Sequence, residues 1–374
     1  MKQTTSSAAQ LAEPESAATE YKTFRLGELF SGPGGLGWAA KAAKNPTAQI
    51  VHQWATDYDA DTCKTYAANV CGNPNDPSVV HADIRDLNYQ RLHELGGIDG
   101  LAFGFPCNDF SIVGERLGFD GKYGPLYTYG LEALRQFKPA WFLAENVGGI
   151  RAKGGMALKQ ILADMVDAGY KVYPHYYKFE EYGIPQARHR MIVIGIRDDI
   201  DREFGIPSPG PYADVDVSAQ TALSGIPAWA TNQEKTRQSN RVIERLSHIP
   251  AGGNAWVPDM PAHLQINTRT KLSSIYRRLD AEKPSYTVTG SGGGGTHIYH
   301  WSQNRALTNR ERARLQTFDD KFVFYGSKES VRKQIGMAVP PRGATIIFEA
   351  ILNTFTDTPY EKTIPSLAHL APES

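Results

Sequence analysis

The chain has 374 residues, 41% of them hydrophobic and 21% charged, and its 40 basic side chains balance 40 acidic ones. This composition excludes collagen-like and highly charged disordered chains, and a neutral total gives no overall attraction to nucleic acid, although a basic cleft stays possible. Cys63, Cys71 and Cys107 are too few for a disulfide scaffold, and we interpret the first two as structural. Residues 1–20 lack the apolar core of a signal peptide, and no run of about 18 apolar residues stands out. We expect a cytoplasmic protein with a disordered N-terminal arm and no membrane segment.

Strand and helix patterns alternate from residue 21 to residue 197. A buried strand over 23–30 leads into a glycine-rich turn at 31–37 and a helix at 38–44. Further strands are predicted at 50–56, 79–81, 100–105, 140–144, 171–179 and 191–196, and further helices at 59–69 and 156–168. This alternation favours an α/β fold with an open, mostly parallel, doubly wound sheet.

Several chemically distinctive features follow the carboxyl ends of these strands. They are the glycine turn, Asp57, Asp83, Cys107 and Glu145. In open α/β sheets ligands bind at that edge, so we expect these features to meet in one crevice. Glycines let the backbone approach a ligand, the Asp57 carboxylate suits two ribose hydroxyls, and the Asp83 carboxylate suits an adenine amino group. Each carboxylate alone is equally compatible with a solvated turn.

Cys107 and Glu145 stand where catalytic groups are typically held. Cys107 directly follows a buried strand, and a reactive thiolate needs such a rigid, polar setting. Glu145 ends an apolar strand, where partial desolvation suits proton donation near neutral pH. Arg188 and Arg190 share one face if the strand at 191–196 extends back to them. Taken singly, these residues also fit a buried cysteine, a capping carboxylate and a solvated basic turn.

The second half of the chain has a different character. From 198 to about 275, Pro, Gly, Ser and Asn become frequent and periodicity fades, which predicts a smaller inserted domain of loops and short strands. Helices are expected at 308–317 and 342–355, the last packing back on the sheet. The predicted organisation is an arm at 1–20, a catalytic and cofactor-binding domain at 21–197, an inserted domain at 198–306, a hinge and returning part at 307–358 and a tail at 359–374.

The order of these features resembles the cytosine-C5 DNA methyltransferase family. The chain carries Phe30-Ser31-Gly32-Pro33-Gly34-Gly35, then Pro106-Cys107, Glu145-Asn146-Val147 and Gln186-x-Arg188-x-Arg190 in the family's order. Leu307 to Phe318 and Gln334 to Pro341 resemble two later blocks of the family. The likeness runs from about residue 21 to residue 352 and is weakest between 198 and 275. It implies a Rossmann-like sheet that binds S-adenosyl-L-methionine and an inserted target-recognition domain.

The resemblance also implies roles for individual residues. The catalytic set is Cys107 as nucleophile, Glu145 on the ring N3 and amine of cytosine, and Arg190 on its O2, with Arg188 nearby. Phe30 and Tyr58 are expected to pack on the adenine of the cofactor. The full cofactor-binding set is Phe30, Gly32, Gly34, Gly35, Leu36, Asp57, Tyr58, Asp83, Ile84, Pro106, Leu126, Met337 and Ala338. No metal ion is expected.

The implied reaction explains these residue types. The Cys107 thiolate adds to C6 of cytosine while Glu145 donates to N3, and C5 then takes the methyl group before proton loss and β-elimination release the cysteine. Because C6 is shielded in a duplex, the base must be flipped out. The segment at 109–129, rich in Gly, Phe and Tyr, is interpreted as a lid that closes over it.

Contact with DNA is expected mainly from the inserted domain, which is locally basic through Arg237, Arg241, Arg245, Arg269, Lys271, Arg277 and Arg278. The glycine-rich stretch that begins at Thr287 is the candidate loop for entering a groove. The proposed DNA contacts are Asn108, Ser111, Arg278, Thr287, Thr289, Gly292 and Gly293. Double-stranded DNA is therefore the expected partner, with a restriction endonuclease or defence system acting on the same DNA, and a monomer is expected by analogy.

Three positions depart from the family pattern, and other functions stay open. Asn108 stands where Gln is usual, Met337 where Asn is usual, and Tyr123 where Arg is common in the lid. The alternatives are an RNA cytosine methyltransferase of the same fold, a catalytically inactive DNA-binding homologue, and a nicotinamide-dependent oxidoreductase. The glycine spacing disfavours the oxidoreductase, and the RNA branch's Cys-Phe-Thr block is missing from the sequence.

Overall fold

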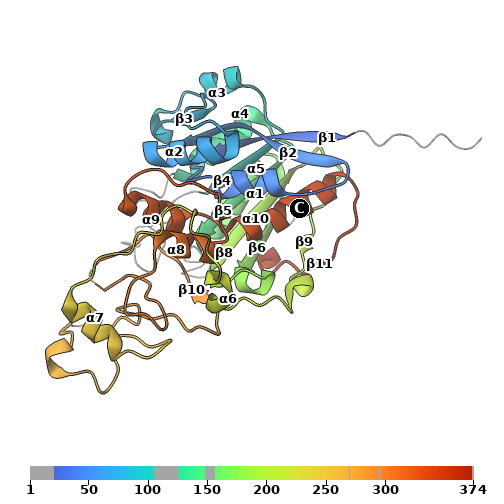
Figure 1. Cartoon of the computed structure of the whole chain (residues 1–374). Helices are drawn as coiled ribbons and strands as arrows, with labels where there is room; N and C mark the ends of the chain where they lie inside the picture. Colours follow the sequence, from blue (N-terminus) through green and yellow to red (C-terminus); the bar gives the residue numbers. More distant parts are fainter. Residues whose placement is uncertain (1–20, 105–125, 148–155, 269, 294, 373–374) are drawn as a thin grey trace, which may run out of the picture.

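A seven-stranded sheet forms the centre of the molecule (Figure 1). The computed structural model describes residues 21–104, 126–147, 156–268, 270–293 and 295–372. The strand order is β3-β2-β1-β4-β5-β8-β6, and β8 runs antiparallel to its neighbours while the other pairs are parallel. The strands are β1 (Lys22–Leu29), β2 (Ala48–Asp57), β3 (Val79–His81), β4 (Gly100–Gly104), β5 (Trp141–Val147), β6 (Tyr170–Lys178) and β8 (His189–Arg197). The expected doubly wound, mostly parallel sheet is confirmed.

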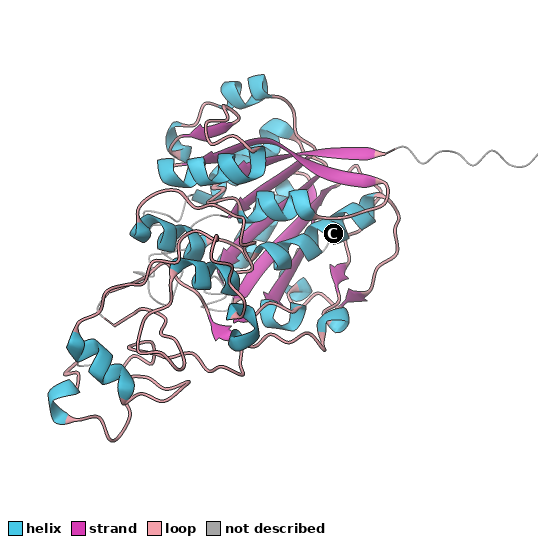
Figure 2. Ribbon diagram, viewed as in Figure 1, coloured by secondary structure: helices cyan, strands magenta, loops and turns pink. Residues whose placement is uncertain are grey.

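Alternation of side chains along the strands creates two hydrophobic cores, one on each face of the sheet. In β5, Trp141 and Leu143 face one core while Phe142 and Ala144 face the other. The first core is covered by α1 (Gly35–Ala42) and α10 (Pro341–Phe355), and the second by α3 (Tyr89–Leu95), α4 (Tyr127–Phe137) and α5 (Met156–Asp167). Helices therefore lie on both faces, as Figure 2 shows.

The last long helix returns to the first strand. The rings of Phe355 in α10 and Phe24 in β1 meet edge to face with centroids 5.2 Å apart, and Lys22 donates to the Phe355 carbonyl at 3.0 Å. A proline at the first turn of α10 suits a helix start, because its missing N–H has no helical partner there. Chain ends that are far apart in sequence thus share one core.

Residues 213–340 form a smaller part that projects from the sheet (Figure 1). One cluster there joins α6 (Ala219–Leu223), α8 (Asn309–Leu315) and α9 (Lys328–Met337), and another surrounds α7 (Asn240–Ser247). α8 begins at a capping box in which Thr308 and Glu311 satisfy each other's backbone N–H groups. The short strand β10 (Ser285–Tyr286) pairs with β7 (Gln186–Ala187), which joins this part to the sheet domain.

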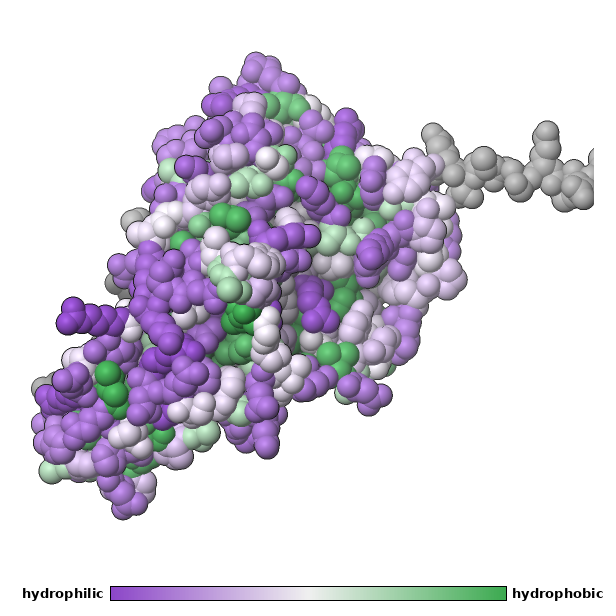
Figure 3. Space-filling model, viewed as in Figure 1, coloured by the Kyte–Doolittle hydropathy of each residue, from purple (hydrophilic) through white to green (hydrophobic). Residues whose placement is uncertain are grey.

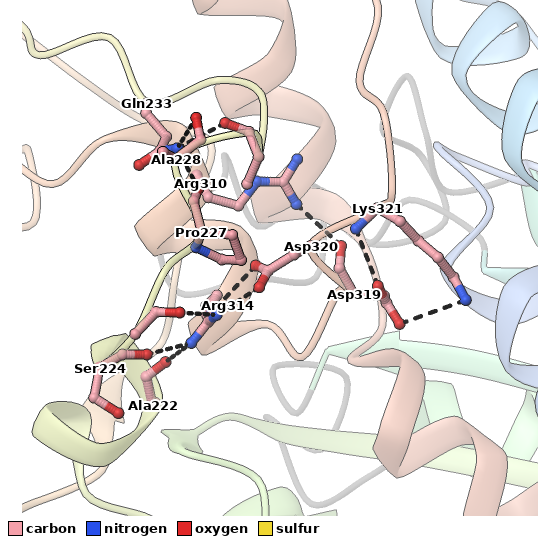
Figure 4. A network of polar contacts seen from close by, with 12 residues as sticks. Ala222, Ser224, Pro227, Ala228, Gln233, Arg310, Arg314, Asp319, Asp320 and Lys321 are labelled. Atoms are coloured by element: carbon pink, nitrogen blue, oxygen red, sulfur yellow. Dashed lines mark hydrogen bonds and ion pairs between the residues drawn. The ribbon is translucent and has the colours of Figure 1, made fainter.

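Arg310, which is buried, and Arg314, which is half-buried, hold the smaller part together from α8 (Figure 4). Arg310 donates to the carbonyls of Thr231 and Asp319, both at 3.0 Å. Arg314 pairs with Asp320 and donates to the Ser224 carbonyl. These helical arginines, predicted only as part of a helix, tie two flanking segments to α8.

Several boundaries differ from the sequence-based expectations. Phe204 and Ile206 lie in the first core of the sheet domain, so we move the proposed start of the inserted domain from 198 to after Tyr212. The tail is packed as well: β11 (Lys362–Thr363) pairs with β9 (Ile206–Pro207), and Leu367 is buried in the second core. The proposed lid also ends earlier, because its last residues form the first turn of α4, where the Tyr127 hydroxyl donates to Asp164 at 2.8 Å.

One stretch of the described residues, Lys328–Phe355, is long and apolar enough to cross a membrane by length and composition. It comprises α9 and α10, and 72% of its most apolar window is buried inside the molecule. Such burial is typical of a core helix that covers a sheet. The face of the molecule seen in Figure 3 is mainly hydrophilic, with small separate hydrophobic spots.

Candidate active site

The glycine turn between β1 and α1 has an unusual backbone. Phe30 has φ of 53° although it carries a side chain, and Gly32 and Gly34 have φ of 57° and 95°. The left-handed region is costly for a side chain such as that of Phe30, and such outliers concentrate at binding sites. A Cβ on Gly32 would meet nothing within 4 Å, so the turn presents open space at this residue. A ligand can therefore approach the backbone closely.

Asp57 fastens this turn from the end of β2. One oxygen of its buried carboxylate accepts the Gly32 N–H at 2.9 Å and the other accepts the Asp59 N–H at 3.0 Å. Burial raises the pKa of Asp57, and the two backbone donors oppose that rise. Each oxygen retains a lone pair for a further donor. Beside it, the buried Ser31 hydroxyl has no hydrogen-bond partner among the described residues. This donor and acceptor set fits the ribose and methionine parts of S-adenosylmethionine.

The proposed adenine contacts lie around the same edge of the sheet. Phe30, Ile84 and Leu126 all belong to or pack against the second core. Tyr58 is 56% exposed, and Lys333 of α9 donates to its hydroxyl at 3.0 Å. Asp83 accepts from the Arg85 side chain at 2.9 Å, so any adenine amino group would share this carboxylate with Arg85.

The end of α9 closes against the glycine turn. A Cβ on Gly35 would lie 2.7 Å from the Val339 carbonyl oxygen and 3.4 Å from the Ala338 Cβ. Gly35 is therefore required for this packing, and Leu36 beside it is buried in the first core. Met337 is 45% exposed, so its thioether is available at the position where the family usually has Asn.

Glu145 and Arg190 form an ion pair at the ends of β5 and β8. Arg190 Nε lies 2.8 Å from Glu145 Oε1, and the side chains are only 11% and 13% exposed. Glu145 faces Ile192 across the sheet, which puts Arg190 on the same face two residues away. Burial lowers the pKa of Arg190, and the Glu145 carboxylate opposes this. On β4, a Cβ at Gly104 would lie 3.2 Å from Glu145 Oε2. Glycine at this position therefore avoids a tight contact with the Glu145 carboxylate.

Arg188 has a different position from Arg190. It is 2% exposed and donates to the carbonyls of Val288 at 3.1 Å and Gly336 at 3.2 Å. The strand is interrupted at this residue, since β7 ends at Ala187 and β8 begins at His189. The described bonds of Arg188 thus join the sheet domain to the smaller part, and we assign it a structural role beside the site in place of contact with the base.

The proposed DNA contacts fall into two groups. Thr287 donates at 2.9 Å to the carbonyl of Ala187, which precedes Arg190 by three residues, while Thr289 and Gly293 are exposed and Gly292 is half-buried. Arg278 was expected to contact DNA, and the structure corrects this. It is 5% exposed, and its guanidinium donates to the carbonyls of Leu246, Ile249, His300 and Gln303 and to the Asn304 side chain.

Pro106, Cys107, Asn108 and Ser111 lie outside the described residues, so their expected roles stay predictions. The other two cysteines are poor nucleophiles, because burial raises the pKa of both Cys63 and Cys71 to about 12. Within the described ranges, no group of three or more His, Cys, Asp or Glu side chains could hold a metal ion.

Gln186 and Lys333, which were missed from the sequence alone, hold other residues of the candidate site in place. Gln186 accepts the Val288 N–H at 2.7 Å and donates to Gln316 at 2.6 Å, and Gln316 in turn donates to the Ala338 carbonyl at 3.0 Å. Lys333 lies beside Tyr58. The recurring Gln186-x-Arg188-x-Arg190 block was a usable signal for Gln186, whereas nothing in the local sequence of Lys333 marks it.

Comparison with known proteins agrees with this geometry. Residues 24–353 match the family model described as C-5 cytosine-specific DNA methylase. Type II methyltransferase M.BbvI of Brevibacillus brevis is 53% identical over 349 residues, which is 90% of this chain and 93% of that protein. Type II methyltransferase M.NgoFVII of Neisseria gonorrhoeae is 37% identical over 355 residues, which is 89% of this chain and 87% of that protein.

Among solved structures, a DNA modification methyltransferase encoded within an Escherichia coli prophage has a TM-score of 0.69. It is 22% identical, and the match covers 89% of this chain and 99% of that one, which supports the fold. The family model and two relatives above 30% identity cover nearly the whole chain. The chain belongs to the C-5 cytosine-specific DNA methylase family and is a DNA (cytosine-5-)-methyltransferase.

Proposed function

We propose that the enzyme methylates cytosine in duplex DNA with Cys107 as nucleophile and with Glu145 and Arg190 holding the target base. The observation that carries this proposal is the buried ion pair of Glu145 and Arg190 at the carboxyl edge of the sheet. An arginine that fixes one carboxylate oxygen leaves the other oxygen to meet N3 and the amine of a flipped-out cytosine. Both residues stand on strands, which hold their positions more firmly than loops do.

S-adenosylmethionine supplies the methyl group when bound. Asp57 accepts hydrogen bonds from its ribose hydroxyls, the turn at Phe30 to Gly35 accommodates its methionine part, and Tyr58 covers its adenine. At the target base, the Cys107 thiolate forms a bond to C6 while Glu145 holds a proton at N3. Once C5 has taken the methyl group and solvent water has accepted the C5 proton, the C6–S bond breaks and the thiolate leaves. The described acceptors and the unpartnered Ser31 hydroxyl support the cofactor part of this proposal.

The biological role proposed is protection of DNA within a restriction–modification pair. The support is the likeness to two proteins named type II methyltransferases. A restriction endonuclease that reads the same short sequence would be the functional partner, acting on the same DNA in the cytoplasm, and we propose that the methyltransferase itself acts as a monomer.

Bisulfite sequencing of a plasmid that carries the gene tests this proposal. We expect methylated cytosines in one short sequence context with the wild type and with Cys71→Ala, a matched cysteine control outside the site. Cys107→Ala and Glu145→Gln should leave every cytosine unmethylated while the proteins stay folded. Methylation by the folded Cys107→Ala protein would refute the assigned nucleophile.

A further inference from the structure

Two arginines lie directly beneath the loop 289–293, which we call the glycine loop. Arg312 of α8 is 1% exposed and donates to the Thr289 carbonyl at 3.3 Å. Arg332 of α9 is 8% exposed and donates to the Gly290 carbonyl at 3.4 Å. Two consecutive carbonyls of one loop are thus held by guanidinium groups from two different helices.

The rest of the loop is held at the same place. The Gly293 N–H donates to His297 Nε2 at 3.1 Å, and burial together with the two arginines lowers the pKa of His297 to about 4, so the ring is neutral at neutral pH and, with Nε2 accepting, carries its proton on Nδ1. A Cβ on Gly292 would lie 2.5 Å from Arg332 Cζ and 2.8 Å from His297 Cε1. A side chain at this position would therefore force the loop or the two side chains beneath it to shift.

The helices that carry the two arginines are themselves firmly mounted. Arg310 and Arg314, one helical turn apart on α8, bind the flanking segments (Figure 4), which leaves Arg312 between them to reach the loop. On α9, a Cβ at Gly336 would come 2.0 Å from the Gly290 nitrogen, so this helix touches the loop backbone directly. The glycine loop rests on a stiff base.

The outer side of the loop presents small polar groups. Thr289 and Ser291 are exposed, and their hydroxyl oxygens are 2.7 Å apart. Arg312 donates to the uncharged Thr289 carbonyl, and Arg332 pairs at 3.0 Å with Glu329, whose side chain is 83% exposed. Positive charge therefore lies directly behind exposed hydroxyl groups, which is the arrangement that attracts a phosphate.

We infer that Arg312 and Arg332 are positioning residues that hold the glycine loop in a preformed shape, so that Thr289 and Ser291 meet the sugar–phosphate backbone of the duplex beside the target base. The inference rests on the proposed assignment of this loop to DNA contact. A preformed loop avoids the entropy cost of ordering five residues, several of them glycines, on binding. The arginines act through the loop, because their burial keeps them from the phosphates.

The test replaces each arginine by lysine, Arg312→Lys and Arg332→Lys, which keeps the charge but removes the planar fork of donors. Gly292→Ala is the third variant, because it pushes the loop away from an intact Arg332. The matched controls are Arg202→Lys, an exposed arginine paired with Asp357, and Gly97→Ala, whose Cβ would meet nothing closer than 3.9 Å. The probe is a short duplex that carries the context in which the wild type methylates plasmid DNA.

We expect each of the three variants to lose about tenfold or more in kcat/KM on this duplex, as loss of a charge-assisted hydrogen bond predicts. The ratio of target to off-target methylation should fall with it. The affinity for S-adenosylhomocysteine should stay within about twofold of the wild type, because the described hydrogen bonds of both arginines go to residues outside the proposed cofactor-binding set. The salt dependence of duplex binding should be unchanged, because no phosphate contact is removed. Both controls should match the wild type.

Three results would overturn the inference. Lysine variants with wild-type selectivity would show that charge alone suffices. The salt dependence is also measured with Arg312→Ala and Arg332→Ala, and a slope that falls by about one in either variant would show direct phosphate contact. If the arginine variants fail to fold, folded Gly292→Ala decides, and normal selectivity there refutes the role of the loop. A wild type that methylates no DNA would instead refute the proposed function.

Discussion

Replacing Arg278 by alanine gives the sharpest separation between a structural and a DNA-contacting role. The guanidinium donates to five acceptors, the carbonyls of Leu246 at 2.7 Å, His300 at 2.9 Å, Ile249 at 3.1 Å and Gln303 at 3.3 Å and the Asn304 side chain at 3.1 Å. The Leu246 and Gln303 carbonyls also accept the backbone N–H groups of Ile249 and Arg305, so alanine would leave only the carbonyls of Ile249 and His300 without a described donor. At about 1–3 kcal/mol for each of these two groups, we expect a loss of about 2–6 kcal/mol.

The loss should be local to the part around α7. Trp256 packs there and donates to the Leu272 carbonyl at 2.8 Å. Since the chain has six tryptophans, the part of the fluorescence that is lost in Trp256→Phe is the signal that reports unfolding of this region in urea. We expect the urea midpoint of the Trp256 signal to fall markedly in Arg278→Ala. Arg241→Ala is the control, because this exposed arginine makes one hydrogen bond, to the His263 carbonyl. A chain of this size need not unfold in one step, so the comparison is between midpoints of the same signal.

Arg278→Ala can also show that the arginine contacts DNA. If Arg278→Ala leaves the midpoint unchanged and lowers the slope of DNA binding against salt by about one, the arginine contacts phosphate. The original sequence-based expectation would then be right and the structural assignment wrong.

Three further predictions concern Glu28, a buried carboxylate of β1 that accepts from the Tyr66 hydroxyl, the cofactor site and the base site. Burial raises the pKa of Glu28 to about 8, so between pH 4.5 and pH 8 the folded protein holds a proton that the unfolded chain releases. The stability of the wild type should therefore fall as the pH rises from about 4.5 to about 8. The unfolding temperature of Glu28→Gln should depend less on pH over this range, and a dependence equal to that of the wild type would contradict the assignment. Asp57→Asn should weaken S-adenosylhomocysteine binding about tenfold or more by calorimetry, since the charged acceptor is lost, and unaltered affinity would exclude Asp57 from the cofactor site. Gly104→Ala, whose Cβ would crowd Glu145, should lower kcat more than it raises KM, and an effect on KM alone would contradict the proposed role of Glu145.

Sequence patterns predicted the central sheet well because burial on two faces leaves a strong signal. The β-branched run in β8 and the apolar run in β5 were recognisable without any tertiary information. α9 escaped notice because its buried face includes Arg332 and Gln334, so only Val331 and Ile335 carry the helical period. Tertiary polar contacts override the hydrophobic pattern there.

The candidate site was predictable by residue type and order but not by burial. Arg190 and Arg278 look alike in sequence, as basic residues near loops, yet one pairs with Glu145 and the other fills a ring of carbonyls. We propose to move the boundary at residue 198 because a change in composition need not be a change of core, and Phe204 and Ile206 still pack on the sheet. Whether such a residue is buried depends on contacts with residues far away in the chain, which the local sequence does not show.

The packing of α10 against β1 has a consequence for how the protein is made. Phe24 and Leu26 share a core with Ile347, Phe348 and Phe355, so the ribosome must synthesise nearly the whole chain before this face of the sheet can be covered. During translation the strands emerge with an apolar face exposed, a state that invites aggregation. We expect the nascent chain to depend on chaperone binding until α10 has left the exit tunnel, and 3′ truncations of the gene to yield insoluble protein even when every catalytic residue is present.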